Sequence, residues 1–61
     1  SPLDFQIRNA LSSAARIKAG QGDGEGAIAL YQRALDTFEL NDATRGLFEL
    51  RIEEIRTARG L

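Results

Sequence analysis

The sequence predicts a small all-α protein, a three-helix bundle made of an antiparallel helical hairpin and a third helix that closes it. Apolar residues recur at intervals of three and four in three segments, which is the period of one face of a helix. Two breaks, one rich in glycine and one formed by Asn and Asp, separate these segments. No segment alternates apolar and polar residues over the length of a strand, so we expect no sheet.

The first helix is predicted over residues 2–19. Asp4 falls in its first turn, where the helix dipole favours negative charge. Gly20 and Gly22 can end the helix in a left-handed conformation because they have no Cβ. Phe5 lies almost opposite the apolar stripe, so either the first turn is irregular or Phe5 touches something outside this domain. That stripe consists of Leu3, Ile7, Ala10, Leu11, Ala14 and Ile17.

The second helix is predicted over residues 24–39, with Asp23 as its N-terminal cap. Gly24 and Gly26 fall in the first turn, and because glycine is a poor helix former the start is expected to fray. The stripe that faces the core combines small and large residues, and the small ones let a neighbouring helix come close. It consists of Ala27, Tyr31, Ala34 and Phe38.

The third helix is predicted over residues 43–59, after the turn-forming pair Asn41-Asp42. Its main apolar stripe consists of Phe48, Ile52 and Ile55. Leu50 and Leu61 lie on a different side of a helical wheel of ~3.6 residues per turn, so this helix has a second apolar strip. Across the three helices we expect one shared core of Leu11, Ala14, Tyr31, Ala34, Phe38, Phe48, Ile52 and Ile55.

Composition argues against several functional classes. The chain has 61 residues, no cysteine and no histidine, which removes the usual general base and the commonest metal ligands. Its formal net charge is −1, without the basic excess of a nucleic-acid binder. No apolar run approaches the roughly 20 residues of a membrane span. We therefore expect one non-enzymatic, cytoplasmic domain that forms part of a longer protein, with no nucleic-acid partner and no membrane insertion.

The glycine-rich turn over residues 20–26 is expected to connect helices rather than bind a cofactor. A phosphate-binding loop follows a buried strand, whereas a helix precedes this turn, and Asp23 and Glu25 would repel phosphate. The turn also lacks the spaced acidic series and the distal glutamate of an EF-hand. Ser13 and Lys18, a conceivable nucleophile and base, do not share a helix face. We expect no cofactor, no metal and no catalytic residue.

Residues 11–40 resemble a tetratricopeptide (TPR) hairpin. Gly22-Asp23 matches the turn between its two helices, Ala15 the small residue at their crossing, and Leu11 a large apolar position. The stripe of the second helix matches as well, but Lys18, Gly24 and Glu39 depart from the TPR pattern. The chain also resembles the MIT (microtubule-interacting and trafficking) domain, in which a third helix closes the bundle. Both families bind peptides or partner proteins.

These resemblances imply an adaptor that binds a peptide or helical segment of a partner protein in a groove between helices. The expected groove residues come from the first and third helices: Asn9, Ser12, Arg16, Leu47, Leu50 and Glu54. Arg16 would pair with a carboxylate of the partner. One alternative is a homodimer formed through exposed Phe5, Leu50 and Leu61. Another is an MIT-type domain that binds the tails of membrane-trafficking proteins.

Overall fold

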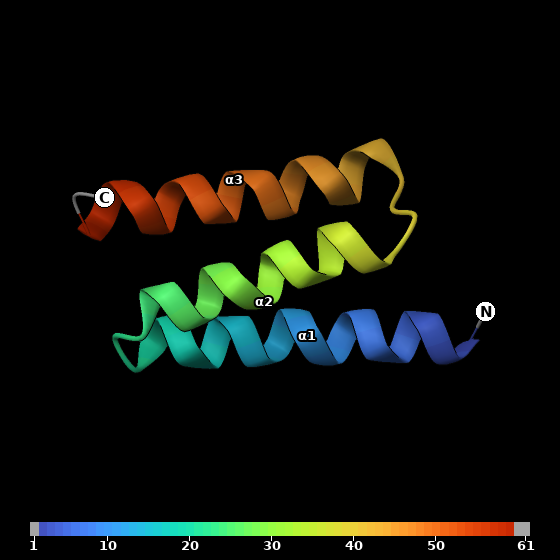
Figure 1. The fold of residues 1–61 in the computed structure, drawn as a ribbon, viewed down its shortest axis with the longest axis horizontal. Coiled ribbons are helices and arrows are strands. Elements are labelled where there is room, and N and C mark those ends of the chain that lie inside the picture. Colours follow the sequence, from blue (N-terminus) through green and yellow to red (C-terminus); the bar gives the residue numbers. More distant parts are fainter. Residues whose placement is uncertain (1, 60–61) are drawn as a thin grey trace.

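The structure, a computed structural model, describes residues 2–59 and the side chains of residues 5–58. Three helices, α1 (Pro2–Gly20), α2 (Gly24–Thr37) and α3 (Asp42–Arg59), follow one another in the chain. Figure 1 shows α2 between α1 and α3, with each helix antiparallel to the next. The predicted all-α class is confirmed. Leu61 and the side chain of Leu3, both used in the sequence predictions, lie outside the described residues and side chains.

Gly22 ends α1, as the sequence predicts. Its φ of 84° is in the left-handed region, and it is the only residue with positive φ in the described chain. The N–H of Gly22 donates to the carbonyl of Ala19, and the N–H of Asp23 donates to that of Lys18 at 2.8 Å. This pair of bonds is the Schellman arrangement, which satisfies carbonyl groups that the helix end would otherwise leave without a partner.

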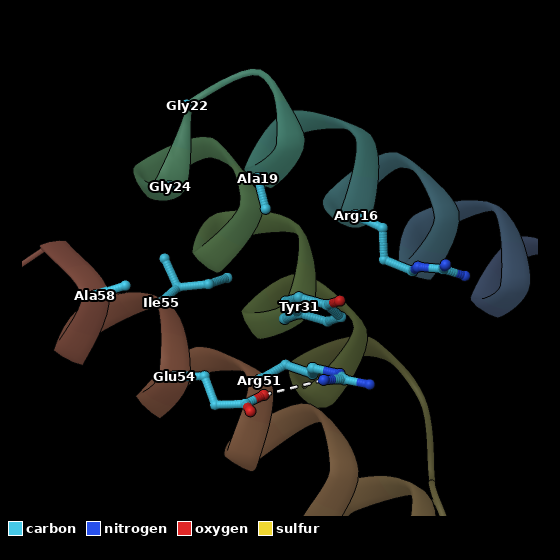
Figure 2. Close-up of a pocket in the computed structure, with 9 residues that line it drawn as sticks. All are labelled: Arg16, Ala19, Gly22, Gly24, Tyr31, Arg51, Glu54, Ile55 and Ala58. Atoms are coloured by element: carbon cyan, nitrogen blue, oxygen red, sulfur yellow. Dashed lines mark hydrogen bonds and ion pairs between the residues drawn. The ribbon is translucent and has the colours of Figure 1, made fainter.

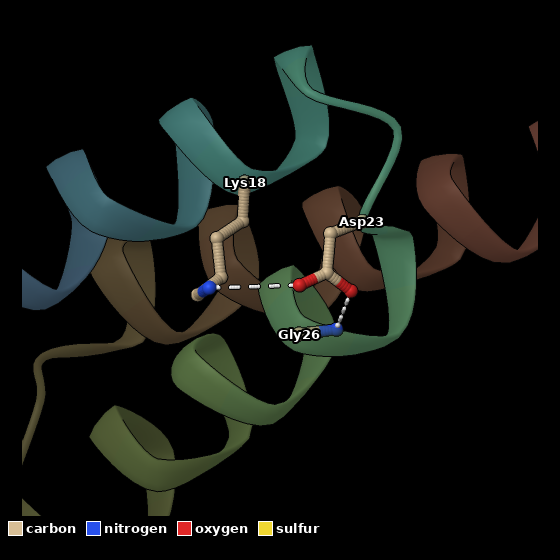
Figure 3. A network of polar contacts seen from close by, with 3 residues as sticks. All are labelled: Lys18, Asp23 and Gly26. Carbon is tan, nitrogen blue, oxygen red and sulfur yellow. Dashed lines mark hydrogen bonds and ion pairs between the residues drawn. The ribbon is translucent and has the colours of Figure 1, made fainter.

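Asp23 begins α2 and links it to the end of α1 (Figure 3). Its Oδ1 accepts a hydrogen bond from the N–H of Gly26 at 2.9 Å, which confirms it as the helix cap. Its Oδ2 lies 3.5 Å from Nζ of Lys18. A Cβ at position 26 would collide with the Asp23 carboxylate. The glycine expected to loosen this turn therefore makes room for the cap that stabilises it.

The core is built mainly on α2, and the predicted stripe of that helix is largely confirmed. Tyr31 and Ala34 are buried, while Phe38 is half-buried against them. Phe48 and Ile52 of α3 are buried, and Ile55 packs against the cluster. The buried hydrophobic residues in the described part of the chain are Ala15, Ala27, Tyr31, Ala34, Leu35, Phe48 and Ile52.

The predicted inward face of α1 is wrong in orientation. Ile7 and Ile17 of the expected stripe are 41% and 61% exposed, and Ala14 is only half-buried. Ala15, which is fully buried, is the residue of α1 that enters the core, with Leu11 packed beside the cluster. The helix turns its small residue toward α2 because a close helix crossing favours alanine over a bulky side chain. The β-branched side chains of Ile7 and Ile17 are left on the surface.

The connection between α2 and α3 begins earlier than expected. α2 ends at Thr37 rather than near residue 39, because Phe38 adopts an extended conformation while its N–H still donates to the carbonyl of Ala34. Asn41 then caps α3, its Oδ1 accepting from the N–H of Thr44 at 2.8 Å. Arg45 reaches back from α3 and donates to the carbonyl of Leu35 at 3.3 Å. The third helix is thus joined to the last turn of α2.

The close crossing generates a prediction about side-chain size. Replacing Ala34, which is 1% exposed, by Leu should lower the free energy of unfolding by about 1–3 kcal/mol, because the extra atoms have no space. The exposed Ala29 of the same helix is a matched control, and Ala29→Leu should change it by less than about 0.5 kcal/mol. Urea unfolding followed by circular dichroism measures both. Equal effects would contradict the packing described for α2.

The cap generates a second prediction, which a double-mutant cycle tests. Asp23→Ala should cost about 1 kcal/mol of unfolding free energy, since the first-turn N–H loses its acceptor. In the Asp23→Ala background, Gly26→Ala should raise the free energy of unfolding by about 1 kcal/mol, because alanine forms helix more readily than glycine. In the wild-type background the same Gly26→Ala change should be nearly neutral, because the new methyl displaces the cap. Additive effects in thermal unfolding would argue against this steric coupling.

Candidate binding groove between α1 and α3

A groove opens between the two outer helices. α2 packs against both α1 and α3, whereas α1 and α3 hardly touch each other, so a space is left between them above α2. This space has a volume of about 620 Å³ (Figure 2). It is lined by Arg16, Ala19, Gly22, Gly24, Tyr31, Arg51, Glu54, Ile55 and Ala58.

A smaller hollow extends this space toward the other end of the helices. It has a volume of about 190 Å³ and is lined by Ser12, Arg16, Tyr31, Leu47, Phe48 and Arg51. Three residues, Arg16, Tyr31 and Arg51, line both spaces. We call the two together the α1–α3 groove, with these three residues at its middle.

Tyr31 forms the floor of the groove. Its side chain is almost entirely buried, with 3% exposure, and its ring lies 5.3 Å from that of Phe48 at an angle of 48°. None of the described residues forms a hydrogen bond with its hydroxyl. Since every fully buried side-chain nitrogen and oxygen in residues 5–58 has a partner, this hydroxyl reaches the solvent of the groove.

Charged side chains form the walls above this floor. Arg51 on α3 donates to Glu54 at 3.0 Å, and both side chains are about half exposed. Arg16 on α1 has no hydrogen bond or ion pair within the described part of the chain. In Figure 2 the two guanidinium groups extend to the same side of the groove, and the Tyr31 hydroxyl points to that side as well. The middle of the groove therefore gathers three hydrogen-bond donors from three helices.

The structure brings four of the six predicted site residues to the groove. Ser12, Arg16, Leu47 and Glu54 line it. The other two, Asn9 and Leu50, are exposed but are not among its lining residues. Leu50 lies three residues after Leu47, which places it about 60° away from Leu47 around the helix axis.

Sequence reasoning missed three important groove residues. Tyr31 and Ile55 were predicted as core residues, and Arg51 was not among the predicted groove residues, yet all three line the groove. Helical spacing contained part of the signal, because Arg51 is four residues after Leu47 and three before Glu54, which puts all three on one side. That Tyr31 lines the groove follows only from the positions of α1 and α3 relative to α2.

Other apolar side chains lie on the surface away from the groove. Phe5 is 54% exposed, and the guanidinium carbon of Arg8 lies 5.2 Å from its ring centre. This geometry is a cation–π contact, which covers one face of the ring. Leu50, of the proposed dimer surface, is 55% exposed.

Comparison with known proteins gives no relative for this chain. No protein-family model matches it, and neither a curated protein nor a solved structure does. None of the helices within residues 2–59 is long and apolar enough to cross a membrane. The TPR and MIT resemblances accordingly stay predictions.

The free hydroxyl of Tyr31 generates a prediction about stability. Tyr31→Phe should change the free energy of unfolding by less than about 0.5 kcal/mol, because the hydroxyl bonds to none of the described residues. Tyr31→Ala should cost about 3 kcal/mol or more, since it removes a buried ring. Thermal unfolding followed by circular dichroism distinguishes them. A loss above about 1 kcal/mol in Tyr31→Phe would mean that the hydroxyl has a structural partner.

Proposed function

We propose that this chain is a non-catalytic interaction module that holds a peptide or helical segment of a partner protein in the α1–α3 groove. The observation that carries the proposal is an open groove whose apolar floor and charged walls come from three different helices. Segments that bind in such grooves place apolar anchors on the floor and charges at the edges. We extend the proposal to an adaptor role in the cytoplasm.

Rigidity of the groove supports this proposal. The floor residue Tyr31 is buried against Phe48, and both neighbouring helices have a defined attachment to α2. α1 is fixed by the Schellman turn and the Asp23 cap, and α3 by the Asn41 cap and the Arg45 hydrogen bond. A site formed in advance loses less conformational entropy when a ligand binds.

The TPR resemblance supports the same proposal from the sequence. It implies that first-helix residues line the binding surface, and Ser12 and Arg16 are in the groove. The resemblance also implies a small residue at the helix crossing, where Ala15 is fully buried. We therefore prefer a peptide-binding module over the MIT-type alternative, for which the described residues offer no separate observation.

Selection from a phage-displayed library of 12-residue peptides tests this function. We expect the domain to select peptides, and their affinity for the domain and its variants can be measured by isothermal titration calorimetry. Leu47→Asp should weaken binding at least about tenfold, because it puts an unpaired charge beside apolar ligand atoms.

Leu50→Asp is the matched control for this experiment. It adds the same charge to the same helix at a similarly exposed leucine, but outside the groove. We expect affinity to change less than about twofold, as for surface changes away from a site. Failure to select any peptide, or equal effects of the two substitutions, would reject the α1–α3 groove as the binding site.

Self-association is the second candidate function, favoured by the exposure of Phe5 and Leu50. Exposed apolar side chains on a small domain commonly mark a contact surface. If these side chains form a homodimer, sedimentation equilibrium of the wild type should give twice the chain mass of 6.7 kDa. Leu50→Asp should then restore the monomer mass without a ligand. A monomeric wild type at high concentration would exclude this function.

A further inference from the structure

We propose that the middle of the α1–α3 groove is a binding site for one carboxylate, the side chain of an Asp or Glu inside the partner segment. Arg16 from α1, the Tyr31 hydroxyl from α2 and Arg51 from α3 supply the donors. Apolar residues of the same segment lie on both sides of this acidic residue. The inference rests on the proposed function and names the chemistry that the groove recognises.

The charge of the groove favours an anion. Its lining holds two arginines and one glutamate, which leaves one positive charge without a counter-charge in the groove. Arg51 already has Glu54 as a partner, so the excess lies with Arg16, which has no ion pair within residues 5–58. A guanidinium group presents paired N–H donors that match the geometry of a carboxylate. Arg16 is therefore the main charged contact of the proposed site.

The Tyr31 hydroxyl is the second observation that indicates a ligand. The ring of Tyr31 is buried, while its O–H reaches the groove and makes no hydrogen bond to the described residues, so it can donate to a ligand there. Its ring is held by Phe48, so the hydroxyl is fixed in direction and points to the side where the two guanidinium groups extend (Figure 2). A carboxylate oxygen placed between the arginines would accept this hydrogen bond. The donor is thus arranged before the ligand arrives.

The apolar parts of the groove indicate that the acidic residue is internal. Ala19, Ile55 and Ala58 line the groove on one side of the Arg16–Tyr31–Arg51 middle. Leu47 and Phe48 line it on the other side. A C-terminal carboxylate bound at the middle would leave one of these apolar parts empty. The chain of the ligand must continue in both directions to cover them, which predicts an apolar–acidic–apolar pattern.

Glu54 competes with the carboxylate of the ligand for Arg51 and so lowers the affinity of this site. Its ion pair with Arg51 is about half exposed, and such surface pairs contribute little to stability. The carboxylate of the ligand can therefore replace Glu54 as the partner of Arg51. Glu54→Gln removes the competing charge from the groove, and it should strengthen the binding of an acidic peptide about threefold to tenfold.

Peptides selected from the 12-residue phage library provide the probe. We expect an Asp or Glu at one position, with apolar residues on both sides of it. Replacing that residue by Asn or Gln should weaken binding to the wild-type domain about tenfold, because a charge-assisted contact is lost. Amidation of the peptide's C-terminus should have no effect. Arg16→Gln should also weaken binding about tenfold, and Tyr31→Phe about threefold to fivefold.

Arg33→Gln is the matched control, since Arg33 is an exposed arginine of α2 that does not line the groove. It removes the same charge and should leave affinity within about twofold of the wild type. After Arg16→Gln, the acidic peptide and its amide counterpart should bind about equally. This loss of discrimination is a readout that a merely structural effect of the substitution would not produce.

Several results would overturn the carboxylate site while leaving the proposed function intact. One is the selection of peptides that bind in the groove, as shown by their sensitivity to Leu47→Asp, but contain no acidic residue. Another is a selected acidic residue whose replacement by Asn or Gln leaves the affinity unchanged. Equal effects of Arg16→Gln and Arg33→Gln would overturn it as well. Loss of binding on C-terminal amidation, without an effect of the internal replacement, would show a terminal carboxylate as the ligand. Selection of no peptide at all would overturn both proposals.

Discussion

The buried ring of Tyr31 is the contact on which the arrangement of the three helices depends. Because α1 and α3 hardly touch, each is held in place only through α2. Tyr31 packs against Phe48 of α3 and belongs to the same buried cluster as Ala15 of α1. A smaller residue at this position would leave a space beneath both outer helices, and a larger one would push them apart. The width of the groove is therefore fixed by the ring that forms its floor.

Alanines on either side of that ring set how closely α1 approaches. Ala15 and Ala27 are fully buried, and Ala34 nearly so. Small residues at a helix crossing let the backbones come close, and the ring of Tyr31 fills the space next to them. This arrangement gives α1 little apolar burial of its own, since Ile7 and Ile17 stay exposed. The end of α1 is secured instead by polar contacts at the Gly22-Asp23 turn.

Sequence alone predicted those features that depend on neighbours along the chain. The three helices, the Asp23 cap, the Gly22 helix end and the stripe on α2 all follow from residues within a turn or two of each other. The inward face of α1 was mistaken because spacing tells which residues share a face, not which face the partner helix contacts. The stripe of Ile7 and Ile17 is as regular as a core stripe, yet α2 packs against the neighbouring face at Ala15.

The groove was predicted in part for the same reason. Ser12, Arg16, Leu47 and Glu54 could be placed from the helical wheel, because residues beside a core stripe border the space between helices. Tyr31 could not be placed in the groove in this way, because a helical wheel does not distinguish a ring that is covered on all sides from one whose hydroxyl reaches solvent. The structure separates these two roles within one side chain. The ring carries packing energy, while the hydroxyl, free of any described partner, can serve recognition without a cost to the fold.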